Sequence, residues 1–275
     1  MTDAHLHLQD PRISDIDSII ASMRETGVTR CVVNGTSPND WENVKILATA
    51  HPDLIIPSYG LHPWKVPCSE NWKTLLKEYL IETSSTPPCI GECGLDRWIR
   101  NYDIQAQEDA FSYQIDLATE LDTPISIHIL KAWGWFIDHL RNRQQTTGIS
   151  SLTGQRGFLL HSYNGSTELI PELISAGAYF SFSGYFLLAR KSKSIETFRH
   201  IPIDRLLVET DSPDMLPPSN VITHPLSSDE SAEINHPSNL SSIYQHLAKA
   251  LNLSKEELIQ QVTKNFAQFF LKSTP

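Results

Sequence analysis

The sequence predicts an α/β protein with the architecture of a (β/α)8 TIM barrel, built as a single domain over residues 1–275. Eight short apolar, β-prone runs alternate with segments of helical character, and this alternation matches the eight units of a closed barrel. Several of these runs end in a histidine or a carboxylate, and the active sites of such barrels lie at the carboxyl ends of the strands. An open doubly wound sheet is the alternative, but eight units favour closure.

Each predicted strand is a short run of apolar and β-branched residues between turn-forming or polar residues. The spacers between the runs are long enough for the helical crossovers that parallel strands require. In chain order, the predicted strands are Thr2–Leu6, Arg30–Asn34, Ile55–Gly60, Cys89–Cys93, Ile125–His128, Gly157–His161, Tyr179–Ser183 and Arg205–Glu209.

Apolar residues recur at helical spacing in several segments between and after these strands. Gly27 is a suitable stop for the first helix, and Ser37 and Pro38 predict the N-cap and first turn of the second. A capping box from Ser254 to Glu257 predicts the start of the last helix. The predicted apolar faces are Ile13, Ile16, Ile19, Ile20 and Met23; Trp41, Val44 and Leu47; Trp72, Leu75, Leu76, Tyr79 and Leu80; Phe111, Ile115 and Ala118; and Leu258, Ile259 and Phe266.

The longest stretch without a clear pattern runs over residues 212–237 and is rich in Pro, Ser, Asn and His. A loop of this length after the last strand of a barrel is usually functional or disordered. We predict that it lies over the active-site face.

The composition is that of a globular protein, with 40% hydrophobic residues and a formal net charge of −10. This acidic balance argues against nonspecific capture of nucleic acid by a broad basic surface, although bound cations would reverse the local field. The four cysteines form no CxxC pair, and Cys31 and Cys89 are expected to be small core residues. No signal peptide or membrane-spanning run is present, so we expect a cytoplasmic protein that does not bind membranes.

His5 and His7 are two residues apart at the end of the first predicted strand. Because side chains alternate along a strand, both imidazoles project from the same face. Two histidines converging in this way are a common start for a divalent-metal site. Asp3 has the same parity and is positioned to orient one of them.

Four more candidate ligands lie at the ends of later strands. Glu92 lies between Gly91 and Gly94, and glycines there allow close approach of an ion or substrate. His128 and His161 each end an apolar run, and Asp211 follows the eighth strand. Each residue alone is also compatible with a structural role. Together, four imidazoles and two carboxylates match the ligand supply of two divalent ions (Mg²⁺, Zn²⁺ or Mn²⁺), with Glu92 shared between them.

A series of motifs runs in order over nearly the whole chain. These are Asp3–His7, Gly60-Leu61-His62-Pro63, Gly91–Asp96, Gln107 with Phe111, Gln114 and Ala118, Pro124–His128, His161–Gly165, Glu209–Pro213, Pro237–Leu240 and Asn265 with Phe269 and Phe270. In these motifs the chain resembles the TatD family of metal-dependent hydrolases, which belongs to the amidohydrolase-like barrels.

The resemblance implies a ligand assignment. One ion would be held by His5, His7, Glu92 and Asp211, and the second by Glu92, His128 and His161. The family includes Mg²⁺-dependent deoxyribonucleases with 3′–5′ exonuclease activity. DNA or another phosphodiester is therefore the expected substrate, and no obligate protein partner is evident. His62 would line the pocket and contact the phosphate or the leaving group.

The chain departs from the family pattern around the substrate. Leu130 stands where an arginine is usual, with Lys131 next to it. Arg97 and Trp98 replace a common aromatic pair, and His161 is followed by Ser-Tyr-Asn-Gly instead of Cys-Phe-Ser-Gly. We expect Arg97 and Trp98 to be substrate contacts together with His62, and Arg97 or Lys131 to supply the missing charge.

The leading functional hypothesis is a two-metal phosphodiesterase in which metal-activated water attacks the phosphorus. Asp211 is the expected general base, and Glu92 and His62 are the other expected catalytic residues. The same centre also suits hydrolysis of a small ester, amide or lactone, because fold does not fix substrate. A nuclease would need an open groove with a stacking aromatic such as Trp64, Trp98 or Trp133. The third alternative is a metal-binding protein without catalysis.

Overall fold

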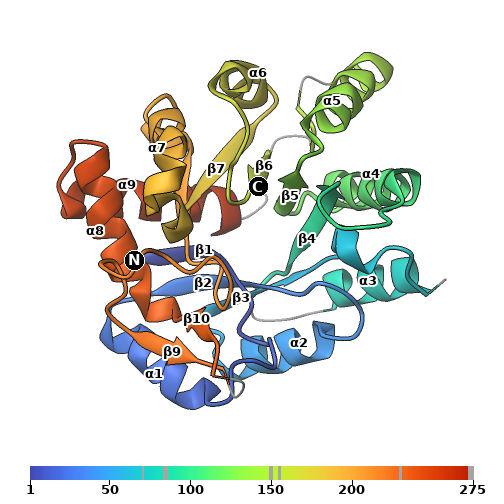
Figure 1. Ribbon diagram of the computed structural model, residues 1–275. Coiled ribbons are helices and arrows are strands. Elements are labelled where there is room, and N and C mark those ends of the chain that lie inside the picture. Colours follow the sequence, from blue (N-terminus) through green and yellow to red (C-terminus); the bar gives the residue numbers. More distant parts are fainter. Residues whose placement is uncertain (70, 83–85, 149–150, 154–155, 229–230, 272–275) are drawn as a thin grey trace.

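The computed structural model describes residues 1–69, 71–82, 86–148, 151–153, 156–228 and 231–271. Eight parallel strands neighbour one another in the order of the sequence, with helices around them (Figure 1). The predicted (β/α)8 barrel is therefore confirmed. The strands are β1 (Thr2–Leu6), β2 (Arg30–Asn34), β3 (Ile55–Tyr59), β4 (Cys89–Asp96), β5 (Ile125–Leu130), β6 (Phe158–Leu160), β7 (Ala178–Ser183) and β8 (Leu206–Glu209).

The barrel is joined between its first and last strands by backbone hydrogen bonds just beyond their carboxyl ends. The Asp211 N–H donates to the carbonyl of His5 at 2.9 Å, and the His7 N–H donates to the carbonyl of Ser212 at 2.7 Å. These bonds satisfy backbone groups that burial would otherwise leave unpaired. They also fix the loop that carries Asp211 against the strand that carries the two histidines.

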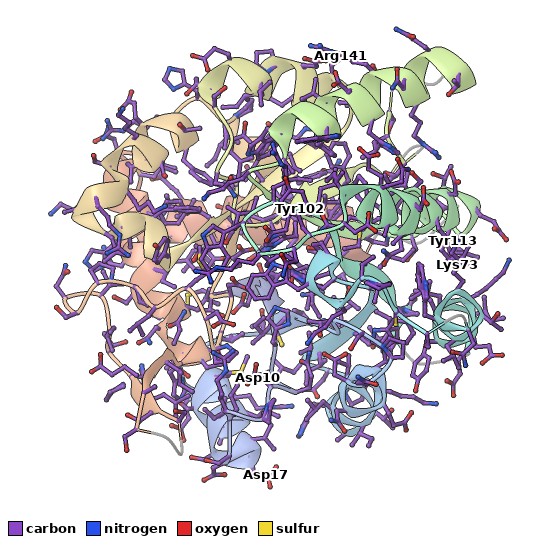
Figure 2. The ribbon with its side chains drawn as sticks, turned by 45° about the vertical axis from the view of Figure 1, so that its right-hand side comes forward. Asp10, Asp17, Lys73, Tyr102, Tyr113 and Arg141 are labelled. Atoms are coloured by element: carbon purple, nitrogen blue, oxygen red, sulfur yellow. The ribbon has the colours of Figure 1, made fainter. Side chains whose placement is uncertain are left out.

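The helices pack their apolar faces on the outside of the barrel and turn charged side chains such as Asp17, Lys73 and Arg141 outward (Figure 2). The ring pairs Phe111–Phe136 and Phe136–Phe158 belong to this apolar layer. Burying one such side chain stabilises the fold by roughly 1.5–3 kcal/mol. The described α-helices are α1 (Ile16–Glu25), α2 (Trp41–Ala50), α3 (Trp72–Ile81), α4 (Ile104–Glu120), α5 (Trp133–Thr147), α6 (Ile170–Ser175), α7 (Ser192–Phe198), α8 (Leu240–Ala250) and α9 (Lys255–Phe266).

Strands β4 and β5 extend beyond their predicted ends at Cys93 and His128. Residues 93–96 pair in register with residues 127–130, which adds backbone bonds that the apolar pattern did not indicate. The added length matters for the site because it places Asp96 beside the strand that carries His128.

The predicted start of the second helix at Ser37 and Pro38 is wrong. Helix α2 begins at Trp41 with Asp40 as its N-cap residue. The Asp40 carboxylate accepts hydrogen bonds from the backbone N–H groups of Thr36 and Ser37, so this segment forms a turn before the helix. The stop after α1 is confirmed, with Gly27 at φ +83°, and so is the capping box of α9.

The 212–237 stretch is not irregular throughout, since it contains the antiparallel strands β9 (Pro225–Ser227) and β10 (Glu233–Asn235). Its two ends meet at the carboxyl end of β8, where Ser212 Oγ donates to the carbonyl of Asn235 at 2.7 Å. Arg12, in the loop after β1, donates to both carboxylate oxygens of Asp214. The stretch therefore begins and ends at the carboxyl-end face, beside β1. Residues 229–230 of this stretch lie outside the described residues.

Two further expectations are tested by the fold. Cys31 and Cys89 are buried, as expected for core residues. Among the described residues, no helix has both the length and the apolar character that crossing a membrane requires.

Candidate metal centre

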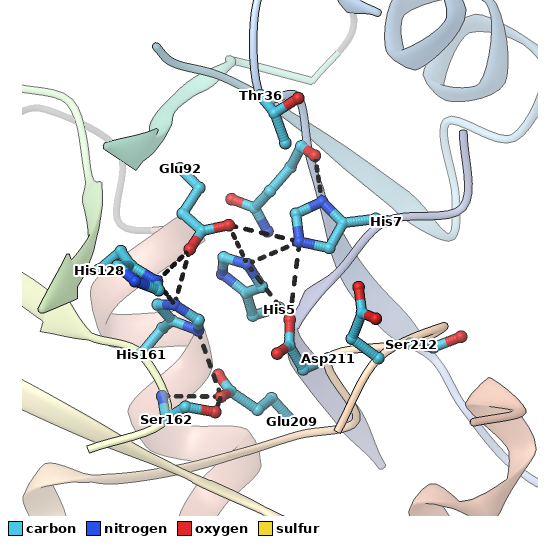
Figure 3. A network of polar contacts seen from close by, with 12 residues as sticks. His5, His7, Thr36, Glu92, His128, His161, Ser162, Glu209, Asp211 and Ser212 are labelled. Atoms are coloured by element: carbon cyan, nitrogen blue, oxygen red, sulfur yellow. Dashed lines mark hydrogen bonds and ion pairs between the residues drawn. The ribbon is translucent and has the colours of Figure 1, made fainter. Parts of the chain in front are cut away.

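Histidines and carboxylates from five strand ends converge at the carboxyl-end face of the barrel (Figure 3). His5 lies within β1 and His7 directly follows that strand, and their Nε2 atoms are 3.3 Å apart. This is the geometry that a spacing of two residues on a strand predicts. His5 is fully buried and His7 almost so, and their ring nitrogens therefore face the interior of the site and not bulk solvent.

Glu92 lies between two pairs of histidines. Its Oε2 atom is 3.4 Å from Nε2 of both His5 and His7. Its Oε1 atom is 2.8 Å from Nδ1 of His128 and 2.8 Å from Nε2 of His161. Each oxygen of one carboxylate thus faces its own pair of imidazole nitrogens.

Asp211 completes the first of these two groups. Its Oδ1 atom is 3.7 Å from Nε2 of His5 and 3.6 Å from Nε2 of His7. The residue has a φ of +54°, a left-handed conformation that is uncommon for residues other than glycine and that clusters at functional sites. The backbone bond from its N–H to His5 holds it in this conformation.

Three of the four imidazoles have a hydrogen-bond partner on the nitrogen that points away from the site. Nδ1 of His7 lies 2.7 Å from the carbonyl of Asn34, which can only accept, so in the neutral ring Nε2 of His7 turns its lone pair to the site. Nε2 of His128 lies 3.0 Å from the Asp96 carboxylate. In the neutral ring, Nδ1 of His128 therefore turns its lone pair to the site. Nδ1 of His5 bonds to Ser126 Oγ at 3.0 Å.

Glu209 lies beside His161, on the side of the ring that faces away from Glu92. One of its oxygens is 3.5 Å from Nδ1 of His161, and the carboxylate also accepts hydrogen bonds from Ser162 Oγ at 2.6 Å and from Ser181. The side chain is fully buried. Burial raises the pKa of Glu209, but the bond and the charge of His161, the charge of His5 and the bond from Ser162 outweigh it and lower this pKa below its ordinary value. A buried carboxylate in this position holds the imidazole in orientation.

The site combines acidic carboxylates with basic imidazoles. Burial favours the neutral acid, but the charge that His62 acquires at acid pH, the charge of His161 and a bond from His128 hold the pKa of Glu92 well below its usual range. Burial alone would lower the pKa values of His7 and His161. The carboxylates that face the two rings outweigh burial, so both pKa values lie well above normal. The ring nitrogens that face the carboxylates therefore attract positive charge, and a divalent cation would displace the protons bound there.

The donor set fits divalent ions by its chemistry. Three overlapping groups bring one ligand atom from each residue within 4.8 Å of the others: His5, His7 and Glu92; His62, Glu92 and His128; and His5, His161 and Glu209. Imidazole nitrogens with carboxylate oxygens suit Zn²⁺, Mn²⁺ and Fe²⁺, and carboxylates also bind Mg²⁺. Of the six residues predicted as ligands, the four histidines contact Glu92, whereas Asp211 contacts His5 and His7 and belongs to none of these three groups.

His62 lies at the edge of this cluster, with its Nε2 atom 3.3 Å from Oε1 of Glu92. Its Nδ1 atom accepts a hydrogen bond from the backbone N–H of Trp64 at 3.1 Å, so the neutral ring carries its proton on Nε2. Burial lowers the pKa of His62 and keeps the ring neutral at pH 7. His62 thus presents one N–H donor to the site.

The predicted substrate contacts have different surroundings. Trp98 is 57% exposed and stacks against Trp64, next to His62. The Arg97 guanidinium lies 4.2 Å from the centre of the Trp135 ring, and its Nε donates to the hydroxyl of Tyr102 at 2.9 Å. Lys131 is exposed, and Leu130 is partly buried beside it.

Sequence reasoning missed three supporting groups. Asp96 appeared only as part of a motif, and the roles of Ser126 and the Asn34 carbonyl were not predicted. Asp96 could have been found from its place in Gly-Leu-Asp at a strand end, but a backbone carbonyl carries no sequence signal.

Fold and site together define the class of barrel hydrolases that work with divalent metals, with the candidate ligands at the carboxyl ends of the strands. Residues 2–271 match the model described as TatD related DNase, and the chain belongs to this family.

The relatives agree with this membership. A 3′-5′ ssDNA/RNA exonuclease TatD from Edwardsiella piscicida is 30% identical over 225 residues, which cover 79% of this chain and 81% of that protein. The uncharacterized metal-dependent hydrolase YcfH from Escherichia coli K12 is 26% identical over 98% of this chain and 95% of its own length. The crystal structure of YjjV, a TatD homolog from E. coli K12, shares the fold with a TM-score of 0.85 at 21% identity, covering 99% of this chain and 98% of that one.

Proposed function

We propose that this protein is a two-metal phosphodiesterase that removes nucleotides from single-stranded nucleic acid. The observation that carries the proposal is the position of Glu92, whose two oxygens face two separate pairs of imidazole nitrogens. A carboxylate shared in this way is the arrangement that a two-metal centre needs. The similarity to 3′-5′ ssDNA/RNA exonucleases supports the substrate class.

Two ions would be held by different parts of the cluster. His5, His7, Asp211 and Oε2 of Glu92 would hold the first, and His128, His161 and Oε1 of Glu92 the second. Divalent ions in such a centre polarise the phosphoryl group and lower the pKa of water to about 7.

The protein groups have distinct roles in the proposed reaction. Asp211 takes the proton of the attacking water with a carboxylate oxygen, and its backbone bond to His5 holds it at the site. His62 donates its Nε2–H to a phosphate oxygen or to the departing oxygen, since the ring is neutral and its Nδ1 is already engaged by Trp64. Glu92 and the four imidazoles orient the substrate by holding the ions. The P–O bond to the leaving nucleotide then breaks as the bond to the water oxygen forms.

A substrate screen tests the proposal. The purified chain would be stripped with chelator, reloaded with Mg²⁺, Mn²⁺ or Zn²⁺, and assayed on single-stranded DNA, a chromogenic phosphodiester and a panel of esters and lactones. We expect metal-dependent hydrolysis of the DNA and the diester, and loss of it with excess chelator. Turnover confined to the esters or lactones would contradict the proposal and favour a small-molecule hydrolase.

A further inference from the structure

Two tryptophans form an exposed pair beside the metal centre. The rings of Trp64 and Trp98 are stacked, with centroids 6.1 Å apart and planes inclined by 27°. Trp64 is 49% exposed and Trp98 is 57% exposed, so each indole presents a large part of its surface to solvent. Offset stacking at this distance is a favourable arrangement for aromatic rings. The pair therefore forms one continuous aromatic surface, which we call the indole platform.

The indole platform is fixed to the metal centre through one carboxylate. Oδ2 of Asp96 accepts a hydrogen bond from Nε1 of Trp64 at 2.7 Å, and Oδ1 accepts one from the backbone N–H of Trp98 at 2.5 Å. The same Asp96 carboxylate bonds to the candidate ligand His128. Because Asp96 is fully buried, it ties the platform and the ligand to the same part of the barrel.

The platform begins next to the residue that faces the scissile bond. The rings of His62 and Trp64 meet edge to face with centroids 5.2 Å apart. His62 in turn lies 3.3 Å from Glu92. A phosphate at the metal centre would therefore have its neighbouring nucleotide at the platform.

The exposure of these rings is unusual for this chain. The exposed large apolar side chains among the described residues are Ile46, Trp64, Ile81, Trp98, Ile203 and Leu271. Of these, only the two tryptophans stack on each other, and both lie beside the metal centre, next to His62 and Asp96. An exposed aromatic surface held rigid beside a candidate active site is characteristic of a ligand contact.

The charge of the chain favours the same ligand. With a net charge of −10, binding of nucleic acid cannot rest on a broad basic surface. Stacking of unpaired bases on aromatic side chains supplies affinity without net charge and without sequence preference. Arg97, the residue before Trp98, holds its guanidinium over the Trp135 ring.

We propose that the indole platform, Trp64 with Trp98, stacks the base that adjoins the scissile phosphate of the substrate. This inference rests on the proposed function. It requires that base to lie outside a duplex stack, because a base inside a duplex has both faces covered by its neighbours. It also predicts little discrimination among bases, since every base has a π-face.

The test compares binding of two oligonucleotides by fluorescence anisotropy. One is a short oligothymidylate with phosphorothioate linkages, which resist hydrolysis, and the other is the same backbone made fully abasic with tetrahydrofuran units. The proteins are the parent chain, Trp98→Leu, which keeps an apolar side chain but cannot stack, and Trp98→Phe, which can. Ile81→Leu is the control at an exposed apolar site on α3, and melting curves confirm that each variant is folded.

We expect the ratio of the abasic Kd to the intact Kd to fall about tenfold in Trp98→Leu, as loss of one stacked base implies. Trp98→Phe should restore most of the parent ratio, and Ile81→Leu should leave it unchanged. An unchanged ratio in Trp98→Leu, or no binding of the intact oligonucleotide by the parent, overturns the inference. Metal-dependent hydrolysis of a chromogenic phosphodiester is measured separately, so that its failure counts against the proposed function and not against the platform.

Discussion

Asp96 and His128 face each other across the neighbouring strands β4 and β5, with Oδ2 of the carboxylate 3.0 Å from Nε2 of the ring. The carboxylate fixes the orientation of the imidazole and leaves Nδ1 of His128 directed at Glu92. Burial opposes charge on Asp96, but the bond and the charge of His128, together with hydrogen bonds from Trp98 and Trp64, outweigh it and lower the pKa of Asp96. This pairing links a residue outside the predicted ligand set to the chemistry of the site.

We therefore expect Asp96→Asn to weaken binding of the ion near His128 by about 10–100-fold, as is usual when the partner of a ligating histidine is removed. The physical reason is that an amide no longer favours the Nε2–H tautomer of His128. Calorimetric titration of the apoprotein with Mn²⁺ measures the effect. Asp138→Asn, an exposed change on α5, is the control, and equal affinities in all three proteins would refute the role of Asp96.

Asp211→Ala should lower kcat by about 10²–10⁴-fold, the usual contribution of a general base. The fold should survive, because Asp211 lies in the loop after β8 and its backbone bond to His5 does not need the side chain. Initial rates on single-stranded DNA and melting temperature are the two measurements. Full metal-dependent activity in Asp211→Ala would show that another group takes the proton.

Gly94→Ala should destabilise the barrel by more than about 3 kcal/mol. Gly94 has a φ of +146°, and a Cβ atom there would lie 1.9 Å from the carbonyl oxygen of His128. Strands β4 and β5 would have to separate next to the metal centre. The matched control is Gly134→Ala in α5, where a Cβ meets nothing within 4 Å and a gain of about 0.5 kcal/mol is expected. Urea unfolding measures the stabilities of both variants, and equal stabilities would contradict the close approach of β4 and β5 at Gly94.

His236 should make the stability of the fold depend on pH. Burial, with repulsion from His224, lowers the pKa of His236 to about 4. The unfolded chain, with a pKa near 6.5, then binds more protons than the folded chain between pH 4 and about 6.5. Stability is therefore lost as the pH falls through this window and is fully present above it.

The corresponding test replaces the ring by a side chain that does not titrate. His236→Asn can still accept the hydrogen bond from the Ser238 N–H. Relative to pH 7, the parent should lose about 1 kcal/mol more than this variant at pH 5, a value reduced for screening near the surface. Urea unfolding at the two pH values gives the difference, with the exposed change His200→Asn as control. Parallel pH dependence in parent and His236→Asn would exclude the effect.

The barrel was predictable because its signals are local. The eight strands were found from short apolar runs, and most of their limits lie within a residue or two of the prediction. The exception is the carboxyl end of β4, which extends three residues beyond its predicted end because these residues pair with β5. The start of α2 was mistaken because Ser37 and Pro38 form a turn around the Asp40 carboxylate, an alternative use of the same residue types.

The convergence of the predicted ligands followed from their places at strand ends. The hydrogen bonds that orient these ligands could not be predicted in the same way, because they depend on strand register and on side-chain rotamers. Asp96 reaches His128 only through the extended β4–β5 pairing, and His7 is oriented by a backbone carbonyl. The stacking of Trp64 on Trp98 likewise joins two loops that are distant in sequence.

The sharing of Glu92 between two ions is the centre of this account, and anomalous diffraction from crystals grown with Mn²⁺ tests it most directly. We predict two anomalous peaks on either side of the Glu92 carboxylate. One should lie against Oε2 with His5 and His7, and the other against Oε1 with His128 and His161. A single peak, or two peaks of which one does not contact Glu92, would contradict the two-metal account.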